Sequence, residues 1–315
     1  MLHFHDGVFL TEIGLGLDVT RPLRTGYISH AHADHMAPHQ LTVCTRETAE
    51  FYRFRLGQQR PVRSLRLDSP ERFGSLEITL LPAGHMLGSS LIYVQGQQSS
   101  LLYTGDFDLA PKATAEPARL PQANILVMEC TFGRPEYVFP PSGEVLDALA
   151  NALQRSLAQG RVPIVHTYVL GKAQELVWQL QQRGFRLCVH QEIAKYCRLY
   201  QQLGVELGDY EIVGNSQPTG RVYLAPPKSQ PGVRTIRIPR SVHLGVTGWA
   251  IDTKTKRRLQ LDHVFPLSDH ADFSQLVQAV QIVQPDKVYC VHGQPEFADV
   301  LRTMGWDAQY RGKRS

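Results

Sequence analysis

The sequence predicts an α/β protein, and two patterns carry this prediction. Short apolar runs, typical of buried strands, end repeatedly in His, Asp or Glu. Between about residues 143 and 203, strand and helix patterns alternate, as they do in parallel β–α–β units. A chain of 315 residues also has room for two domains, each with its own core.

The first part of the sequence reads mainly as strands. Strand-like runs occur at residues 7–11 and 16–19, and a helix pattern follows from Thr45 to Leu56, with Thr45 as its N-cap. Further strands are expected around residue 65 and at residues 78–81, 100–106 and 125–133.

The pattern changes at about residue 143, where an amphipathic helix begins that Gly160 ends. A strand, a helix, a strand and a helix are then expected at residues 162–165, 172–183, 185–189 and 191–203. This alternation predicts a separate layer of parallel strands and helices. In the last segment, residues 265–273 open a helix pattern, and a buried strand is expected at 287–293.

Residues 29–35 concentrate metal-binding side chains, with His30, His32, Asp34 and His35 in one loop behind a strand. Imidazole suits zinc and similar ions, and carboxylate oxygens suit harder ions such as manganese. One short loop cannot place four such groups on a single tetrahedral ion without strain. Side chains that alternate in direction along the loop would turn His30 and His32 one way and Asp34 and His35 another. This indicates two neighbouring metal positions. The alternative is a His-rich surface loop.

Other candidate ligands follow strands further along. His85 lies between glycines after a strand, a poor place for core packing and a good one for projecting into a cleft. Asp106 ends a buried strand, where a carboxylate is costly without a cation or hydrogen-bond donors. The alternative for Asp106 is a β-turn. Asp18 is a candidate acceptor for a ligand imidazole, or simply a residue that starts a turn.

These motifs resemble those of the metallo-β-lactamase fold, and in particular of its β-CASP nucleases. The resemblance rests on HxHxDH at 30–35, AGHxLGS around His85, Gly-Asp at 105–106, ECTFG at 129–133, GKAQE at 171–175, and His270 and His292. The runs TRPLRTGYISHAHADH, LYTGDFDLAP, YVLGKAQEL, TGWAID and LSDHADF are most similar to the bacterial DNA-ligase-associated exonucleases, which are related to the crosslink-repair nucleases. The resemblance extends from about Gly7 to Gly293. One departure is His292, because the crosslink-repair group has no His there.

The resemblance implies an αββα metallo-β-lactamase sandwich with an inserted β-CASP α/β domain. It places the first part of the sandwich at residues 1–140, the inserted domain at 141–255 and the second part of the sandwich at 256–315.

The resemblance also implies a site. One metal would be held by His30, His32, His85 and Asp106, and the other by Asp34, His35, Asp106 and His292. Glu129 or Asp34 would orient the attacking water, and His270 would give a proton to the departing oxygen. Alone, either His270 or His292 could equally be a polar residue at the end of an element.

Candidate residues for binding phosphate or nucleic acid are Ser89, Thr131, Lys172, Thr247 and Trp249. Lys172 opens a helix whose free N–H groups favour phosphate, and Trp249 is suited to stack on a base. The alternatives are an ordinary helix start and a core tryptophan.

The implied function is a two-metal phosphodiesterase with zinc or manganese. We expect a DNA exonuclease that acts on single-stranded ends in DNA repair, with the 5′ side favoured and a DNA ligase or helicase as partner. A β-CASP ribonuclease of RNA processing is the main alternative. A hydrolase of small esters and a non-catalytic nucleic-acid-binding subunit are less favoured, because the first needs no basic stretch and the second no full ligand set.

Charge and composition are consistent with a nucleic-acid partner. The net charge is only +4, but residues 221–258 hold nine Lys or Arg and one acid, Asp252. Such a stripe attracts a phosphate backbone, although it can also be a solvated surface. No apolar run approaches the ~20 residues of a membrane helix, the N-terminus resembles no export signal, and the five cysteines form no CxxC pair. We therefore expect a cytoplasmic protein without a membrane partner.

Overall fold

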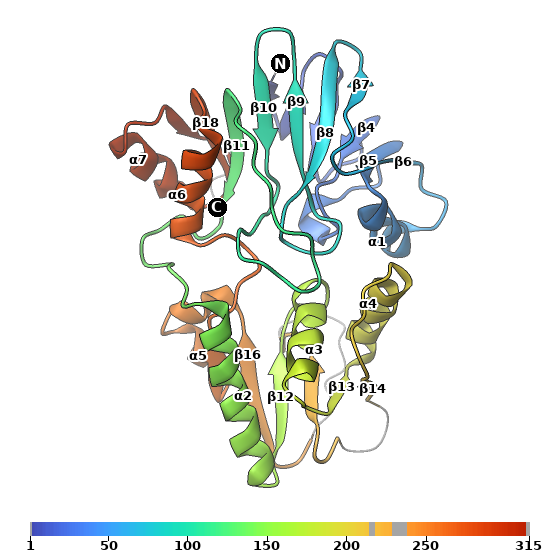
Figure 1. The fold of residues 1–315 in the computed structure, drawn as a ribbon, viewed down its shortest axis with the longest axis vertical. Helices are drawn as coiled ribbons and strands as arrows, with labels where there is room; N and C mark the ends of the chain where they lie inside the picture. Colours follow the sequence, from blue (N-terminus) through green and yellow to red (C-terminus); the bar gives the residue numbers. More distant parts are fainter. Residues whose placement is uncertain (1, 214–217, 229–237, 313–315) are drawn as a thin grey trace. The chain divides into compact units, whose positions relative to one another are not determined.

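The computed structural model describes residues 2–213, 218–228 and 238–312. The chain forms two compact units, which are coloured along the sequence in Figure 1. Unit 1 consists of Met1–Tyr137 and His270–Ser315, and unit 2 consists of Val138–Asp269. The points where the chain leaves and re-enters unit 1 are tied together, because Phe273 N donates to Tyr137 O (2.9 Å). Unit 2 is therefore an insertion into unit 1.

Unit 1 contains two sheets. The first has six strands in sequence order: β1 Leu2–Phe4, β2 Val8–Leu10, β3 Leu15–Leu17, β4 Thr25–Tyr27, β5 Leu41–Thr45 and β6 Val62–Leu65. The second has seven strands in the order β19 Ala308–Tyr310, β18 Lys287–Gly293, β11 Ile125–Cys130, β10 Ser100–Tyr103, β9 Ser90–Gln95, β8 Leu76–Pro82 and β7 Glu71–Phe73.

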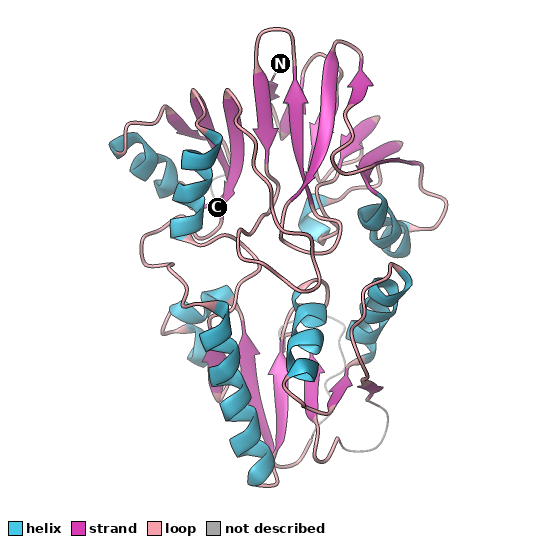
Figure 2. Ribbon diagram, viewed as in Figure 1, coloured by secondary structure: helices cyan, strands magenta, loops and turns pink. Residues whose placement is uncertain are grey.

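The two sheets of unit 1 pack face to face. One apolar cluster joins Leu17 and Val43 of the first sheet to Ile92 and Val127 of the second. A second cluster lies on the other face of the second sheet, beneath α6 (Phe273–Val283) and α7 (Glu296–Thr303). On the first sheet, α1 (Arg46–Leu56) packs against β5 and β6. The layers therefore run helix, sheet, sheet, helix, which confirms the expected fold class (Figure 2).

Strand pairing in the second sheet places β18, from the last part of the chain, beside β11. β11 pairs in parallel with β10 on one side and with β18 on the other. Glu129 of β11 is in register with Val291 of β18, next to His292. The carboxyl ends of parallel strands meet at one edge of a sheet, so side chains from distant parts of the sequence are delivered to the same edge.

Unit 2 has one six-stranded sheet whose strand pairs are all parallel. The strand order is β14 Glu211–Ile212, β13 Leu187–Val189, β15 Val222–Ala225, β12 Val162–His166, β16 Ser241–Val246 and β17 His263–Phe265. The helices of this unit are α2 Ser142–Ala158, α3 Lys172–Gln182, α4 Gln191–Gln202 and α5 Thr255–Arg258, with a 3-10 turn, η2, at Gly248–Ile251.

The alternation expected between residues 143 and 203 is present as α2, β12, α3, β13 and α4. The structural unit ends later than the expected boundary at residue 255. Residues 256–269 belong to unit 2 because β17 pairs with β16, and α5 also contacts β17. In the described part of the chain, no helix combines the length and apolarity that crossing a membrane would need.

Candidate metal centre

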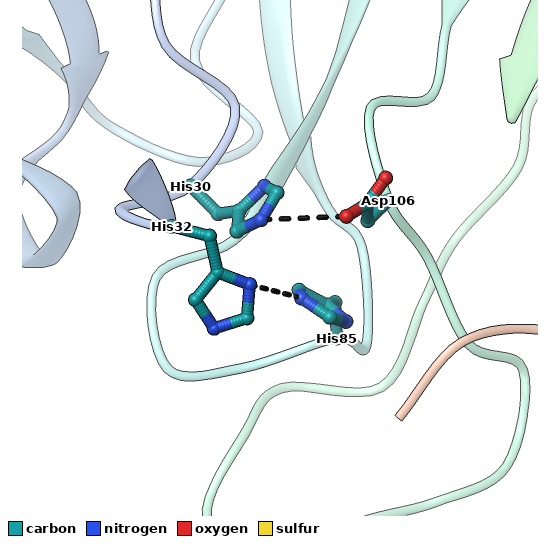
Figure 3. A group of neighbouring side chains, drawn as sticks. All are labelled: His30, His32, His85 and Asp106. Carbon is teal, nitrogen blue, oxygen red and sulfur yellow. Dashed lines mark hydrogen bonds and ion pairs between the residues drawn. The ribbon is translucent and has the colours of Figure 1, made fainter. Parts of the chain in front are cut away.

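Four of the expected ligands converge in unit 1 (Figure 3). His30 and His32 lie in the loop after β4, His85 in the turn between β8 and β9, and Asp106 in the loop after β10. One ligand atom of each lies within 4.8 Å of the others. His85 Nε2 is 3.1 Å from His32 Nδ1, and His30 Nε2 is 3.5 Å from Asp106 Oδ2. Ligand atoms that bind one cation at about 2 Å are separated by about 3–3.5 Å, so this spacing fits a divalent metal.

The ring of His30 is held in one tautomer by its neighbour. Ser29 Oγ donates its only hydrogen to Asp18 Oδ2 (2.6 Å), so it must accept from His30 Nδ1 (3.0 Å). His30 Nε2 therefore carries a lone pair. This buried nitrogen has no hydrogen-bond partner among the described residues, although it faces the carboxylate of Asp106. A lone pair that faces a carboxylate is unfavourable unless a cation lies between them, so these donors fit a bound metal.

Asp18 is the anchor of this loop. Its buried carboxylate accepts from Ser29 N (2.7 Å), Ser29 Oγ, Tyr103 OH (2.9 Å) and His35 Nδ1 (3.0 Å). The bond from His35 is the one expected for Asp18 from the sequence. Because Nδ1 of His35 donates to Asp18, its Nε2 is turned to Asp106 Oδ2, 3.2 Å away.

The charges of the site are strongly coupled. Burial, together with the neighbouring imidazoles, lowers the pKa of His30 well below its usual value, so this ring is neutral. Burial also opposes protonation of His35, but the charge of Asp106 and hydrogen bonds to Asp106 and Asp18 raise its pKa well above the usual value. Burial would raise the pKa of Asp106, yet His35 and His270 outweigh it and hold this pKa well below normal. Asp106 is therefore ionised, and its negative charge attracts cations.

Gly105 allows Asp106 to approach the loop after β4. Its φ is +54°, in the left-handed region that glycine adopts without strain. A Cβ at this position would lie 2.4 Å from Ser29 Oγ and 3.3 Å from Asp18 Oδ2. Any larger residue would therefore displace the hydroxyl that orients His30.

A second group shares Asp106 with the first. Ligand atoms of Asp106, Glu129 and His270 lie within 4.8 Å of one another. His270 Nδ1 donates to Glu129 Oε2 (3.0 Å) and lies 3.2 Å from Oε1. Phe107 N and Thr131 Oγ1 also donate to the buried Glu129, at 2.9 and 2.5 Å. Glu129 thus fixes the ring of His270.

Three expected ligands, Asp34, His35 and His292, lie outside these groups. Asp34 is exposed on the 3-10 turn η1 (Ala33–His35) and joins no such group among the described residues. His292 is also exposed, and its ring centroid is 5.2 Å from that of His35. The structure therefore gathers His292 beside the site but does not place its nitrogen with the other ligand atoms.

The two expected phosphate-binding residues of unit 1 are engaged within the protein. Ser89 is buried, and its Oγ accepts from His85 N (3.2 Å) and Met86 N (3.1 Å), which shapes the turn that carries His85. Thr131 donates to Glu129. Both hydroxyls therefore support site residues in this structure.

The other three expected residues lie in unit 2. Lys172 is buried and forms an ion pair with Asp269 (3.0 Å), so its charge is already compensated. Thr247 caps η2 and accepts from the backbone N–H of Trp249 (3.4 Å). Trp249 is half-buried, as a residue at the rim of a pocket is.

Sequence reasoning missed two residues that position the site. Ser29 was visible as a hydroxyl directly before His30, but its double contact with Asp18 and His30 depends on the fold. Tyr103 belongs to an apolar strand and reads as core, so no signal in the sequence marks it as a donor to Asp18.

Comparisons with known proteins agree with this geometry. Residues 256–310 match the family model described as the Zn-dependent metallo-hydrolase RNA specificity domain. The chain is 38% identical over 308 residues to a protein of Opitutus terrae named probable DNA ligase, covering 97% of this chain and 30% of that protein. It is 28% identical over 278 residues to the 5′ exonuclease Apollo of Gallus gallus, covering 84% of this chain and 58% of that protein.

Ribonuclease TTHA0252 of Thermus thermophilus is 31% identical over 118 residues, which cover 37% of this chain and 27% of that protein. The chain belongs to the β-CASP family of the metallo-β-lactamase fold. The expected family is thereby confirmed. This β-CASP chain spans less than two thirds of the length of each of these three relatives. The family model and the group around Asp106 together support a divalent metal at this centre.

Proposed function

We propose that this chain is a two-metal DNA exonuclease that acts on single-stranded ends, with the 5′ side favoured. The observation that carries the proposal is the shared position of Asp106. It belongs both to the group with His30, His32 and His85 and to the group with Glu129 and His270. A metal site and a candidate proton donor are thus joined at one carboxylate.

We assign the first cation to His30, His32, His85 and Asp106, and the second to Asp34, His35, Asp106 and His292. The contact of His35 Nε2 with Asp106 Oδ2 and the ring of His292 beside His35 support the second set. When bound, a pair of zinc or manganese ions supplies an acidified water and neutralises charge on the phosphate group.

His270 is the proposed general acid. Its Nδ1–H is committed to Glu129, so the proton that it can transfer sits on Nε2. The buried negative charge of Glu129 stabilises the imidazolium and fixes the direction of the ring. His270 would then protonate the departing oxygen of the phosphodiester. Since both oxygens of Glu129 are engaged, we assign orientation of the attacking water to the exposed Asp34.

The preference for DNA rests on the relatives and on charge. A protein named as a DNA ligase contains a segment similar to 97% of this chain, which favours a role beside ligation and a ligase or helicase as partner. The relative named as a 5′ exonuclease supports action from the 5′ side. Such a role in DNA repair fits a cytoplasmic protein and the cationic stretch at residues 221–258.

A ribonuclease is the second candidate. The model that matches residues 256–310 is described as an RNA specificity domain, and one relative is named as a ribonuclease. The test must therefore compare substrates that differ only in their sugar, which is deoxyribose in DNA and ribose in RNA.

The test uses DNA and RNA single strands of matched sequence, labelled at either end, with zinc and manganese supplied separately. We expect mononucleotides to be released from DNA, starting at the 5′ end, and little release from RNA. Preferential cleavage of RNA would support the ribonuclease instead. If the metal-loaded protein cleaves neither strand while the Asp106→Asn variant has lost its metal, the centre binds metal but the nuclease proposal is wrong.

A further inference from the structure

Unit 2 contains a pocket of about 340 Å³ at the carboxyl ends of its parallel strands. It is lined by residues of four segments, at 166–168, 227–228, 245–249 and 258–261. The first three of these segments contain or follow the ends of β12, β15 and β16. In the sheet, β15 lies on one side of β12 and β16 on the other, so the pocket lies where the strand order reverses. Ligands bind open α/β sheets at such places, and pockets of this volume hold small molecules.

The pocket wall at residues 166–168 is held in place by its backbone. Thr167 is only 2% exposed, and its backbone N–H donates to Ala225 O (3.0 Å), at the end of β15. This wall is therefore part of the folded sheet edge, and the side chains that can meet a ligand are the more exposed ones around it.

Two aromatic side chains line the same pocket. Tyr168 is 47% exposed, and Lys172 Nζ lies 5.2 Å from the centre of its ring. Trp249 is half-buried, and its backbone is fixed by Thr247 Oγ1 and by Thr255 Oγ1, which donates to Trp249 O (2.7 Å). An indole at a pocket wall is suited to stack on a flat aromatic group such as a nucleobase.

The polar lining of the pocket is cationic. Lys228 and Arg258 line it, and none of the lining residues that the structure describes is acidic. Lys228 Nζ donates one hydrogen to Gln260 O (2.8 Å), which leaves two of its three hydrogens for other acceptors. His166 offers no further donor, because its ring nitrogens contact Pro226 O (2.8 Å) and His243 Nδ1 (2.9 Å). Lys228 and Arg258 are therefore the groups that would meet an anion such as phosphate.

We infer that this pocket binds a nucleoside monophosphate group. The base stacks on Trp249, and the phosphate meets Lys228 and Arg258. The choice of a nucleotide rests on the proposed nuclease function. A free mononucleotide and the terminal nucleotide of a strand share this chemistry.

The test measures binding of deoxyadenosine monophosphate to the full chain by calorimetry. Chelator is present throughout, so that phosphate cannot bind to metal. We expect one nucleotide per chain, with at least about tenfold weaker binding of deoxyadenosine or of inorganic phosphate alone, because each lacks one of the recognised parts. Absence of binding by both the nucleotide and a 5′-phosphorylated single strand would overturn the inference.

Two variants locate the binding. Arg258→Gln and Trp249→Leu should each weaken it about tenfold. Arg257→Gln is the matched control, because Arg257 belongs to the same helix α5 and does not line the pocket. If Arg258→Gln and Trp249→Leu bind as tightly as the unaltered chain, the nucleotide binds elsewhere and the inference is wrong.

Competition separates the two sources of the ligand. A 5′-phosphorylated strand that displaces the mononucleotide identifies the strand end as the ligand, whereas a mononucleotide that it cannot displace identifies free product. Both results support the pocket. Nuclease assays on the metal-loaded protein are read separately: cleavage without pocket binding would refute this inference alone, and pocket binding without cleavage would refute the proposed function alone.

Discussion

The metal centre of unit 1 and the pocket of unit 2 are built from different kinds of residue. The centre uses His and Asp, residue types that are rarely buried without a specific purpose. The pocket uses Thr, Tyr, Trp, Lys and Arg, which occur in many surroundings. The centre was therefore readable from the sequence, whereas the pocket became visible only when three strand ends were brought together. A site can be recognised from the sequence when its residue types rarely serve any other purpose.

The largest effect should come from removing the carboxylate that both groups of unit 1 share. We expect Asp106→Asn to lower turnover by about a thousandfold or more, because the neutral amide no longer balances the charge of two cations. Metal content, measured by mass spectrometry, should fall with it. Nucleotide binding in the pocket should be unchanged. Full metal content in Asp106→Asn would contradict the ligand role.

His270→Ala should lower turnover by about 10²- to 10⁴-fold, since it removes the proposed proton donor. Metal content should stay at the level of the unaltered chain, which mass spectrometry checks. His263→Ala is the control, an exposed histidine of β17. A loss of metal as severe as that of Asp106→Asn would instead make His270 a ligand.

Asp18→Asn should weaken metal binding by about 10- to 100-fold, because Asp18 orients His35 and, through Ser29, His30. Titration with zinc against a competing chelator measures this change. Asp68→Asn matches the substitution on an exposed residue with a similar backbone, since φ is 59° at Asp68 and 47° at Asp18. Equal affinities of the two variants would show that the hydrogen bonds of Asp18 do not tune the metal.

The smallest effect concerns pH and the wall of the pocket. Burial is the main cause that lowers the pKa of His166 to about 4, with contributions from His243 and Lys228. The unfolded chain binds this proton below about pH 6.5 and the folded chain only near pH 4, so stability falls as pH falls between these values. We expect this one group to lower the free energy of unfolding by about 2 kcal/mol between about pH 7 and 4.5.

Urea denaturation followed by circular dichroism measures this dependence. His166→Asn should show a shallower loss of stability in acid than the unaltered chain. His263→Asn, at an exposed position, should keep the original slope. An unchanged slope in His166→Asn would mean that other groups dominate, among them His243, whose pKa burial also lowers.

The sequence predicted elements best where local signals were strong. Thr45 was expected to cap a helix that ends at Leu56, and its Oγ1 accepts from Thr48 N (3.2 Å) at the start of α1. β15, β16 and β17 were not predicted, because their stability comes from parallel neighbours rather than from an alternating pattern. Unit 2 extends past the expected boundary at residue 255 because β17 pairs with β16.

Within the site, the sequence predicted which side chains are present but not the order of contacts between them. His30, His32, His85 and Asp106 converge as expected. The partner of Glu129 could not be predicted, because His270 lies 141 positions further along the chain. Lys172 was expected to face phosphate, and its ion pair with Asp269 depends on a turn that no local pattern marks.

The hydrogen bond from Phe273 N to Tyr137 O has a consequence for how such chains can change over time. It joins the two parts of unit 1 at the point where unit 2 is inserted, so unit 1 stays continuous across the insertion. A change in the length of the inserted segment leaves this junction in place. The unit that holds the cluster around Asp106 and the unit that holds the pocket can therefore diverge at different rates.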